Sequence, residues 1–567
     1  MAPNILHLPN GQTISVSSVF GGLYFKNNEL STHHQSHMPP GWTIVLHSED
    51  DEEENAKNLP AQQNPDEDDN IYTQTASSHI HRYRKPTLHN DAVFISSISN
   101  PSNNDFKPAV SQTRSIAMML WATLWWYFHQ PMPALQSPFP AQSPEAGRPK
   151  EEWRIRIKRE GIFKAKHLLP KLERMGLVAT DGSSVGVEDE KHNKAWDRIF
   201  VSQRAFWQID PRIYLFTLSP THSSPMMPST PHSSRPSSPS RGETNTGNPG
   251  PPGSRPTSVS ADTGLWSPAM EMGPFASSSH LPTYYPPHPA QYISTNGIRH
   301  PLRPKPPRQG ETIYTRYVPS LGQYISLRVA SLSQDPIPYR GPTGSPYGAG
   351  MTYSTNSSGQ TPAITPPGQS TPQPSFLPPQ SAVRTALHSP PLPSQMAYIP
   401  SSDLTVLNKW HNDPRVAAFW GESGPISRTE KFLHIGLSSK HSFPILGCFD
   451  GKPFGYFELY WVKEDRLGPL IDRGRAGDWD RGIHALVGEQ EFRGPHRVEV
   501  WLSALVHYLW LQDARTERIW CEPRIDNTKF IEYLKQVGFR QEGEVTFPYK
   551  QSALMTISRD TWIAPAL

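Results

Sequence analysis

The fold is decided by residues 480–539, which read DRGIHALVGEQEFRGPHRVEVWLSALVHYLWLQDARTERIWCEPRIDNTKFIEYLKQVGF. The apolar segment 483–488 predicts a strand, and the polar, glycine-containing segment 491–497 predicts a loop. Residues 498–511 are apolar almost all round, which indicates a buried helix rather than a surface helix.

A second strand is expected at 518–521, followed by the turn 522–527 and a last helix. That helix ends at Val537-Gly538-Phe539, where Gly538 stands in a natural C-terminal capping position. Strand, loop, helix, strand, turn and helix is an order that presents backbone N–H groups at a helix N-terminus to a phosphate. The stretch therefore predicts a site for a phosphorylated cofactor beside a second substrate.

Proline content divides the chain. Of 62 prolines in 567 residues, 36 lie between Leu218 and Pro400, a region that is also rich in Ser, Thr and Gly and cannot bury enough apolar surface to fold. We therefore expect an N-terminal α/β domain at 1–218, a disordered linker at 219–310 and a second domain at 311–567. A disordered insert at 338–398 would interrupt the second domain, which is tolerable because loop-closure entropy grows slowly with length.

Charge and cysteine content argue against several classes of function. A net charge of +3 gives no electrostatic reason to expect a nucleic acid or an anionic membrane as partner. Cys448 and Cys521 lie in apolar, strand-like segments and offer neither a disulfide framework nor zinc-ligand spacing, so no metal site is expected. No secretory signal begins the sequence, and the most apolar helix, 116–128, is too short to span a bilayer, so we expect a cytoplasmic protein.

A basic segment at 148–174 offers a rival interpretation. It holds ten Lys and Arg in a strand, a turn and an amphipathic helix, which could form a winged-helix DNA reader. Four glutamates interrupt it, namely Glu151, Glu152, Glu160 and Glu173. DNA binding is therefore the less favoured reading.

The long stretch resembles the GNAT superfamily of acyl-CoA N-acyltransferases. Its RGPH at 493–496 lies where that family has its pyrophosphate loop, although Pro495 and His496 replace the usual small glycines. Asn527, Tyr533 and Gly538-Phe539 resemble the family's Asn…Tyr…Gly-Phe ending.

Two further blocks, WHNDPRV at 410–416 and GIH at 482–484, extend the likeness to the fungal hydroxyornithine transacylases of siderophore biosynthesis. The resemblance implies an α/β fold, with a mixed, largely antiparallel sheet flanked by helices in a GNAT-like C-terminal domain. It also implies that the N-terminal half is a second, degenerate GNAT-like domain without the cofactor loop.

The implied co-substrate is acyl-CoA, with no permanently bound cofactor. Arg493 and Arg497 would supply charge for its diphosphate, unless they are only surface charges, and the pantetheine arm would pair with the backbone at 486–488. The expected cofactor-binding residues are Leu486, Val487, Gly488, Arg493, Gly494, His496, Arg497 and Asn527.

The implied acceptor is a hydroxylamine, which is largely neutral near physiological pH but must lose a proton during or after attack. His484 has the right unperturbed pKa to take it, although a strand histidine can equally be a packed core residue. Asp526 could orient the imidazole, bind the substrate amine or cap the next helix. Tyr533 could protonate the departing thiolate or belong to the core.

Residues that could bind the acceptor are polar or aromatic side chains near the expected cleft, and the sequence does not rank them. They are Trp410, Asn412, Trp420, Glu458 and Asp480.

The function expected is therefore acylation of the side-chain hydroxylamine of N-hydroxyornithine in hydroxamate siderophore biosynthesis. Acetyl-CoA is the favoured donor because Pro565-Ala566-Leu567 lacks the basic residue of a peroxisomal signal. The alternatives are anhydromevalonyl-CoA as donor, a different GNAT amine N-acetyltransferase, and a non-enzymatic scaffold or DNA-binding protein. The expected partners are small molecules, without nucleic acid or membrane, and a homodimer is left open.

Overall fold

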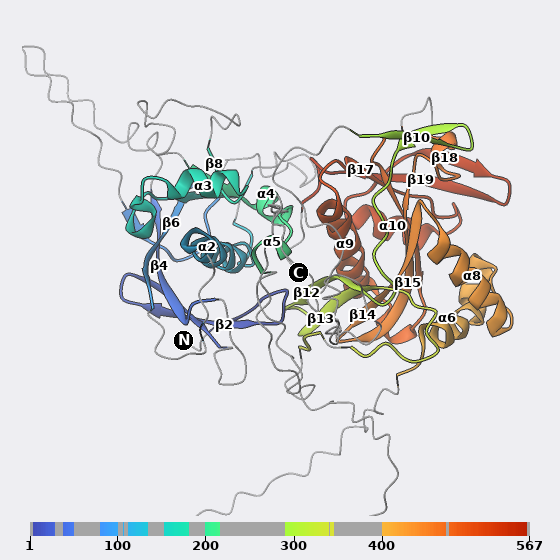
Figure 1. The fold of residues 1–567 in the computed structure, drawn as a ribbon, viewed down its shortest axis with the longest axis horizontal. Coiled ribbons are helices and arrows are strands. Elements are labelled where there is room, and N and C mark those ends of the chain that lie inside the picture. The colour runs from blue at the N-terminus through green and yellow to red at the C-terminus, as the bar shows by residue number, and fades with distance from the viewer. Residues whose placement is uncertain are drawn as a thin grey trace, which may run out of the picture.

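The computed structural model describes residues 4–28, 38–49, 80–99, 106, 111–133, 152–180, 199–215, 290–339, 341–344, 400–471 and 476–563. These residues form two α/β halves, each built on one large sheet (Figure 1). None of the helices in these ranges is long and apolar enough to cross a membrane.

The N-terminal half contains nine strands of one sheet. They are β1 (Asn4–His7), β2 (Thr13–Val19), β3 (Gly22–Asn27), β4 (Gly41–Glu49), β5 (Ile80–Arg82), β6 (Asp91–Ile98), β7 (Arg154–Ile157), β8 (Ala179–Thr180) and β9 (Ile199–Ser202). Its described helices are α2 (Gln112–Phe128), η2 (Gly161–Lys164), α3 (Leu168–Arg174), α4 (Gln203–Trp207) and α5 (Arg212–Leu215).

The C-terminal half contains an eight-stranded sheet. Its strands are β12 (Thr312–Val318), β13 (Gln323–Val329), β14 (Ser442–Phe449), β15 (Lys452–Trp461), β16 (Arg481–Val487), β17 (Arg518–Cys521), β18 (Arg540–Phe547) and β19 (Lys550–Ser558). The helices described there are α6 (Asp403–His411), α7 (Pro414–Trp420), α8 (Ile426–Ser438), η5 (Gly468–Leu470), η7 (Gln490–Phe492), α9 (Pro495–Gln512) and α10 (Thr528–Gln536).

Both sheets follow one plan. The N-terminal order is β1-β2-β3-β4-β6-β7-β9-β8, and the C-terminal order, β12-β13-β14-β15-β16-β17-β19-β18, repeats it position by position. In each sheet the neighbours along this path are antiparallel except for one pair, β6 with β7 and β16 with β17. The expected mixed, largely antiparallel sheet is therefore confirmed, and it occurs twice.

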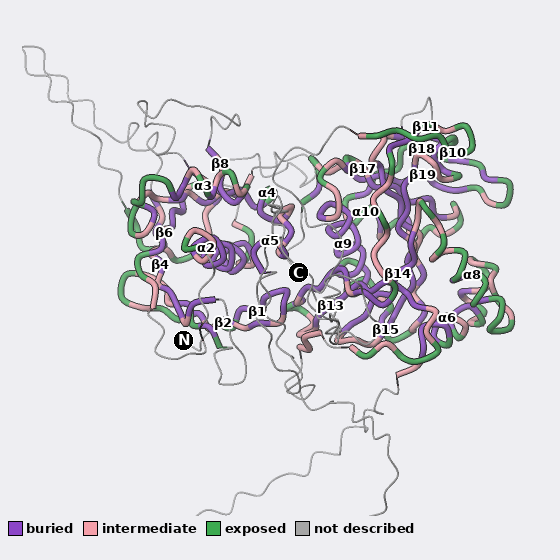
Figure 2. Tube along the Cα trace, in the orientation of Figure 1, coloured by how far each residue is buried: buried purple, intermediate pink, exposed green. Residues whose placement is uncertain are grey.

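The most apolar helix of each half packs against its own sheet. All residues of α2 from Ile116 onward are buried, as are nearly all of α9 from Val498 onward (Figure 2). The predicted buried helix at 498–511 is confirmed, and it begins three residues earlier, at Pro495, whose missing N–H has no partner to lose in the first turn. Helices α6 to α8 cover the opposite face of the C-terminal sheet, and their cluster includes Trp410, Leu433 and Tyr456.

A hairpin lies inside the segment that is predicted to be linker. Residues 292–301 form a hairpin of β10 (Tyr292–Thr295) and β11 (Ile298–Pro301), and its turn is Asn296-Gly297, both with positive φ. Asn-Gly is the strongest short hairpin signal, so local turn chemistry outweighs the proline-rich surroundings here. Residues 219–289 of the predicted linker lie outside the described residues. So does nearly all of the predicted insert 338–398.

Candidate active site

The parallel pair β16–β17 separates soon after it begins. Arg481 is paired with Ile519 and Gly482 with Trp520, and the described residues show no later pairing between the two strands. Past Cys521 the chain continues beside β19 instead. An opening is thus left between β16 and the continuation of β17.

One edge of this opening offers backbone hydrogen-bonding groups. The Gly488 N–H donates to the Phe454 carbonyl of β15 at 2.9 Å, and backbone groups alternate in direction along a strand, so those of Ala485 and Val487 point into the opening. A chain that carries amide groups, such as pantetheine, could pair there. Of the three backbone positions predicted for this arm, only Val487 faces the opening, because Leu486 and Gly488 face β15.

His484 stands at the opening between two carboxylates. Its Nδ1 is 2.9 Å from Glu458 Oε2 on β15, and its Nε2 is 2.6 Å from Glu522 Oε1, just beyond β17. Because carboxylates accept hydrogen bonds, both ring nitrogens donate, and the ring is an imidazolium.

The electrostatics agree with this assignment. Burial opposes the charge on His484, but the charge of Glu522 and the bonds to both carboxylates outweigh it, so the pKa of His484 lies well above its usual range. Burial alone would raise the pKa of Glu522, yet the imidazolium lowers it to about 2. The resting site therefore holds a cation between two anions.

Glycine at position 482 makes room for this arrangement. A Cβ there would lie 2.0 Å from the Tyr460 ring, which packs beside the His484 ring at 4.7 Å between centroids. The Tyr460 hydroxyl donates to Glu522 Oε2 at 2.7 Å. The Gly-Ile-His block is thus explained physically, since Gly482 lets Tyr460 hold the carboxylate that holds His484.

Helix α7 forms a wall on the other side of Glu458. The Tyr456 hydroxyl donates to Glu458 Oε1 at 2.9 Å, and the Trp420 ring meets the Tyr456 ring edge-on at 5.8 Å. Of the predicted acceptor-binding residues, Glu458 and Trp420 are therefore brought to the site. Glu458 is 23% exposed and Glu522 only 3%, so Glu458 is the carboxylate that an incoming molecule can reach more easily.

The start of α9 carries the predicted anion-binding turn. Gly494 precedes the helix with φ +123°, a conformation that favours glycine, and His496 is exposed beside it. Arg493 is exposed, and both its partial burial and the nearby Arg415 lower its pKa. Tyr533 also lies close enough to raise that pKa slightly.

The sequence analysis missed Arg415, on α7. Its guanidinium donates to the carbonyls of Val487 and Gly488 at 2.9 Å each and to Asp413 at 3.2 Å. It therefore reaches the end of β16 beside the opening and adds a second positive charge next to Arg493. Two cations at this place fit a diphosphate-bearing chain.

Arg497 does not point to the same place. Its Nη1 donates to Gln323 Oε1 at 2.7 Å, and its guanidinium lies over the rings of Phe449 and Phe492. A structural role under the loop fits these contacts, so the predicted diphosphate contact from Arg497 is not supported.

Asp526 is not the partner of His484. It forms an ion pair with Arg524, at 2.5 Å between Oδ2 and Nη2, on the exposed surface. Asn527 precedes α10 without a capping bond from its side chain, and Tyr533 packs partly buried against the core. The carboxylate that orients the imidazole is Glu522, which strand register places opposite His484 and which distance along the sequence did not reveal.

Three predicted acceptor-binding residues have structural roles. Trp410 is buried against Gly488, where a Cβ would lie 2.1 Å from the indole, and its Nε1 donates to Glu489. Asp480 is 2% exposed and accepts from Trp520 Nε1 at 2.9 Å.

Asn412 is the third of these. Its side-chain amide bridges the carbonyls of Asn408 and Gly424, while its Oδ1 accepts from Ser423 and the Gly424 N–H. All four of these bonds are local, so Asn412 fixes the turn after α7 rather than a substrate.

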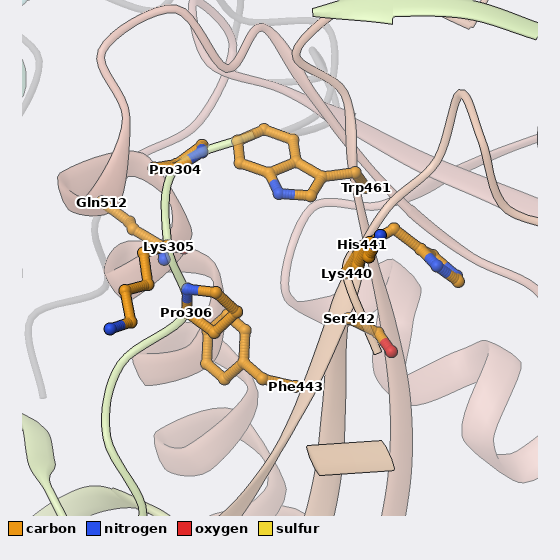
Figure 3. Close-up of a pocket in the computed structure, with 9 residues that line it drawn as sticks. All are labelled: Pro304, Lys305, Pro306, Lys440, His441, Ser442, Phe443, Trp461 and Gln512. Atoms are coloured by element: carbon orange, nitrogen blue, oxygen red, sulfur yellow. The ribbon is translucent and has the colours of Figure 1, made fainter. Parts of the chain in front are cut away.

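A small pocket elsewhere is unrelated to this site. It is lined by residues 304–306 and 440–443, by Trp461 of β15 and by Gln512 of α9 (Figure 3). Phe443 is paired with Leu459, and Leu459 and Trp461 project from β15 on the side opposite to Glu458. The pocket thus opens on the other face of the sheet from His484.

Comparison with known proteins agrees with the geometry. Residues 399–547 match the acetyltransferase (GNAT) domain family. The chain is 41% identical over 585 residues to N5-hydroxyornithine acetylase sidL of Beauveria bassiana, covering 97% of this chain and 100% of that protein.

Two other similarities cover less. The N(5)-hydroxyornithine:cis-anhydromevalonyl coenzyme A-N(5)-transacylase SIDF of the same fungus is 42% identical over 29% of this chain and 35% of its own length. A solved structure of aminoglycoside acetyltransferase AAC(6')-Ib with coenzyme A covers 28% of this chain and 90% of its own, at 24% identity and a TM-score of 0.26.

The full-length match settles the family. It spans both halves, including the N-terminal half that the GNAT domain family does not cover. The expected acyltransferase class, with acyl-CoA as co-substrate, is thereby confirmed. The chain belongs to the GNAT acyltransferases, in the family that contains N5-hydroxyornithine acetylase sidL.

Proposed function

We propose that this enzyme transfers an acetyl group from acetyl-CoA to the side-chain hydroxylamine of N5-hydroxyornithine, in hydroxamate siderophore biosynthesis. The observation that carries the proposal is the Glu458–His484–Glu522 cluster at the opening between β16 and β17. The name of the full-length relative supports the acceptor and the donor.

The residues suit a neutral nucleophile. Acyl-CoA supplies an activated thioester, and the carbonyl carbon accepts the hydroxylamine nitrogen. Once attached, that nitrogen carries a positive charge and becomes strongly acidic, so a carboxylate is a strong enough base. Glu458 is the more accessible carboxylate and takes this proton.

His484 then has a different role from the one expected. As an imidazolium it cannot accept a proton, but it can give one to the departing thiolate and recover it from Glu458. Glu522, held by Tyr460 and by the Lys550 Nζ donation to its carbonyl at 3.0 Å, keeps the imidazole oriented. Arg493 and Arg415 would hold the diphosphate, with Gly494, His496 and Asn527 around it, and Tyr533 is retained as an alternative acid.

The test is a substrate panel. The purified protein should form a hydroxamate from acetyl-CoA and N5-hydroxyornithine, detected by its ferric complex and by mass, and should leave ornithine unchanged. Equal turnover of ornithine would favour an ordinary amine acetyltransferase. Faster turnover with anhydromevalonyl-CoA than with acetyl-CoA would move the enzyme to the SIDF type of donor.

We also propose a cytoplasmic location, supported by two buried free cysteines, Cys448 and Cys521. Imaging of a fluorescent fusion tests it, and a peroxisomal pattern would contradict it. A domain division near residues 218 and 311 and a homodimer stay predictions, to be checked by limited proteolysis and by size-exclusion chromatography with light scattering.

A further inference from the structure

An exposed ion pair lies beside the cluster and has no role in the chemistry above. Arg524 Nε and Nη2 donate to the two carboxylate oxygens of Asp526, at 3.1 and 2.5 Å. The side chains are 40% and 56% exposed. Such an exposed pair contributes little to stability, so opening it for a ligand costs little.

The backbone sets its distance from the reacting groups. Beyond β17 the chain stays extended beside β19, because the Pro523 carbonyl accepts from Ala553 N–H at 2.9 Å and the Ile525 N–H donates to Gln551. In an extended segment, residues two apart project from the same face about 6–7 Å apart. Arg524 therefore lies on the same face as Glu522, one step outward.

Helix α7 connects the two places independently. Its Trp420 packs on the Tyr456 ring next to Glu458. Its Ala418 carbonyl accepts from Arg524 Nη1 at 3.4 Å, and the 50%-exposed Phe419 ring lies 5.2 Å from the guanidinium. One short helix thus contacts both the Tyr456–Glu458 pair and Arg524.

We propose that Arg524 and Asp526 bind the α-amino acid head group of the acceptor, a function that rests on the proposed hydroxyornithine acylation. The guanidinium pairs with the substrate carboxylate, and the Asp526 carboxylate pairs with the substrate ammonium. In an ornithine derivative four single bonds separate the α-carbon from the side-chain nitrogen, a zigzag span of about 5 Å. This span is of the same order as the step of about 6–7 Å from Arg524 to Glu522, and His484 links Glu522 to Glu458.

The test separates the head group from the reacting group. N5-hydroxyornithine is compared with N-hydroxyputrescine, which has the same hydroxylamine and chain length but no carboxylate. Arg524→Ala should lower kcat/KM for hydroxyornithine about 10- to 100-fold, as expected for loss of a charge-assisted bidentate contact, and leave hydroxyputrescine and the KM for acetyl-CoA unchanged. Arg524→Lys should recover part of the loss, and Asp526→Asn should weaken hydroxyornithine binding by a smaller factor.

A matched control exists on β18. Arg540 and Glu542 form an exposed ion pair two residues apart, at 3.0 Å, and Arg540→Ala should change neither acceptor. A loss in Arg524→Ala that is equal for both acceptors would indicate a structural role and overturn the inference, as would a hydroxyornithine kcat/KM within twofold of wild type.

Calorimetric titration of the CoA-loaded protein separates the two proposals. Binding of hydroxyornithine that depends on Arg524, without turnover, would disprove the proposed reaction while supporting this head-group site. Turnover of hydroxyornithine that does not change in the Arg524→Ala variant would support the proposed reaction and disprove the head-group site.

Discussion

The two halves carry the same sheet, but they differ at the point where the parallel strands part. Ala92 of β6 corresponds in register to Gly482 of β16. Each is the second residue of its strand, and each pairs with the third residue of the parallel neighbour, Arg156 of β7 or Trp520 of β17. The N-terminal residues at the positions of Glu458, His484 and Glu522 are then Val45, Phe94 and Lys158. The charged cluster is absent from the N-terminal half at these positions.

The opening itself is also closed there. The Lys158 N–H donates to the Val93 carbonyl at 3.0 Å, which extends the parallel ladder by one step. The chain then turns back onto β6 at Gly161, where φ is +54° and a Cβ would lie 2.2 Å from the Ile95 carbonyl oxygen. The edge of β16 that faces the opening therefore has a counterpart in β6 that the chain's own backbone covers. A shared topology thus sets the place of the site, and the path of the chain after the second parallel strand decides whether it is open.

Removal of the His484 imidazole should have the largest effect. His484→Ala should reduce turnover about 100- to 10,000-fold while acyl-CoA affinity stays near wild type, because general acid–base help is lost and the anion-binding turn is untouched. Val45→Ala, at the N-terminal position that corresponds to Glu458, should leave turnover unchanged. Near-normal turnover in the His484 variant, measured by hydroxamate formation, would refute the assignment.

A smaller effect is expected from the positive charge of Arg493, in the turn before α9. Arg493→Ala should weaken acyl-CoA binding about tenfold, and the loss should shrink as salt screens the diphosphate. Arg159→Ala, which removes an arginine just after β7 where the N-terminal opening is closed, serves as the control. Calorimetry should also give one acyl-CoA per chain, and a stoichiometry of two would mean that the N-terminal half is not closed.

The smallest expected effect is on the free energy of unfolding, and it concerns two buried carboxylates, Glu49 in the N-terminal half and Glu522 in the C-terminal half. The hydrogen bond from His47, with Lys158 and Arg156 nearby, lowers the pKa of Glu49 to about 2, as the His484 imidazolium does for Glu522. A carboxyl with a lowered pKa stabilises the fold above its ordinary value of 4.5, and this contribution is lost as pH falls toward 2.

Glu49→Gln and Glu522→Gln should therefore each lower the free energy of unfolding at neutral pH, on the order of 1–3 kcal/mol, by a margin that narrows as the pH falls below 4.5. Urea titrations at several pH values measure this. Only Glu522→Gln should also lower turnover, and a matching loss of turnover in Glu49→Gln would mean that the halves are catalytically coupled.

Local patterns in the sequence predicted much of this molecule. The all-round apolar run at 498–511 predicted the buried helix α9, and the short apolar run at 483–488 predicted the strand β16 that carries His484. The hydrogen-bond partners of His484 were harder to predict, because they depend on the register between neighbouring strands. Asp526 and Glu522 are equally plausible from spacing alone, and only the pairing of Gly482 with Trp520 selects Glu522.

Burial explains the remaining errors. Trp410 and Asp480 were predicted to bind the acceptor, but both are buried. The Trp410 ring packs where a side chain at Gly488 would lie, and the Asp480 carboxylate accepts a hydrogen bond from the Trp520 indole. Arg415 was overlooked because its partners are backbone carbonyls, which leave no mark in a sequence.

The junction between the halves has a mechanical consequence. His507 on α9 donates from Nε2 to the Trp207 carbonyl of the N-terminal half and accepts from the Tyr314 hydroxyl at Nδ1, because burial lowers its pKa to about 3 and keeps it neutral. Twelve residues, or about 18 Å of rigid helix, separate His507 from Pro495. The N-terminal half therefore anchors the middle of α9, and the rigid helix carries this constraint to Gly494 and the turn before its first residue.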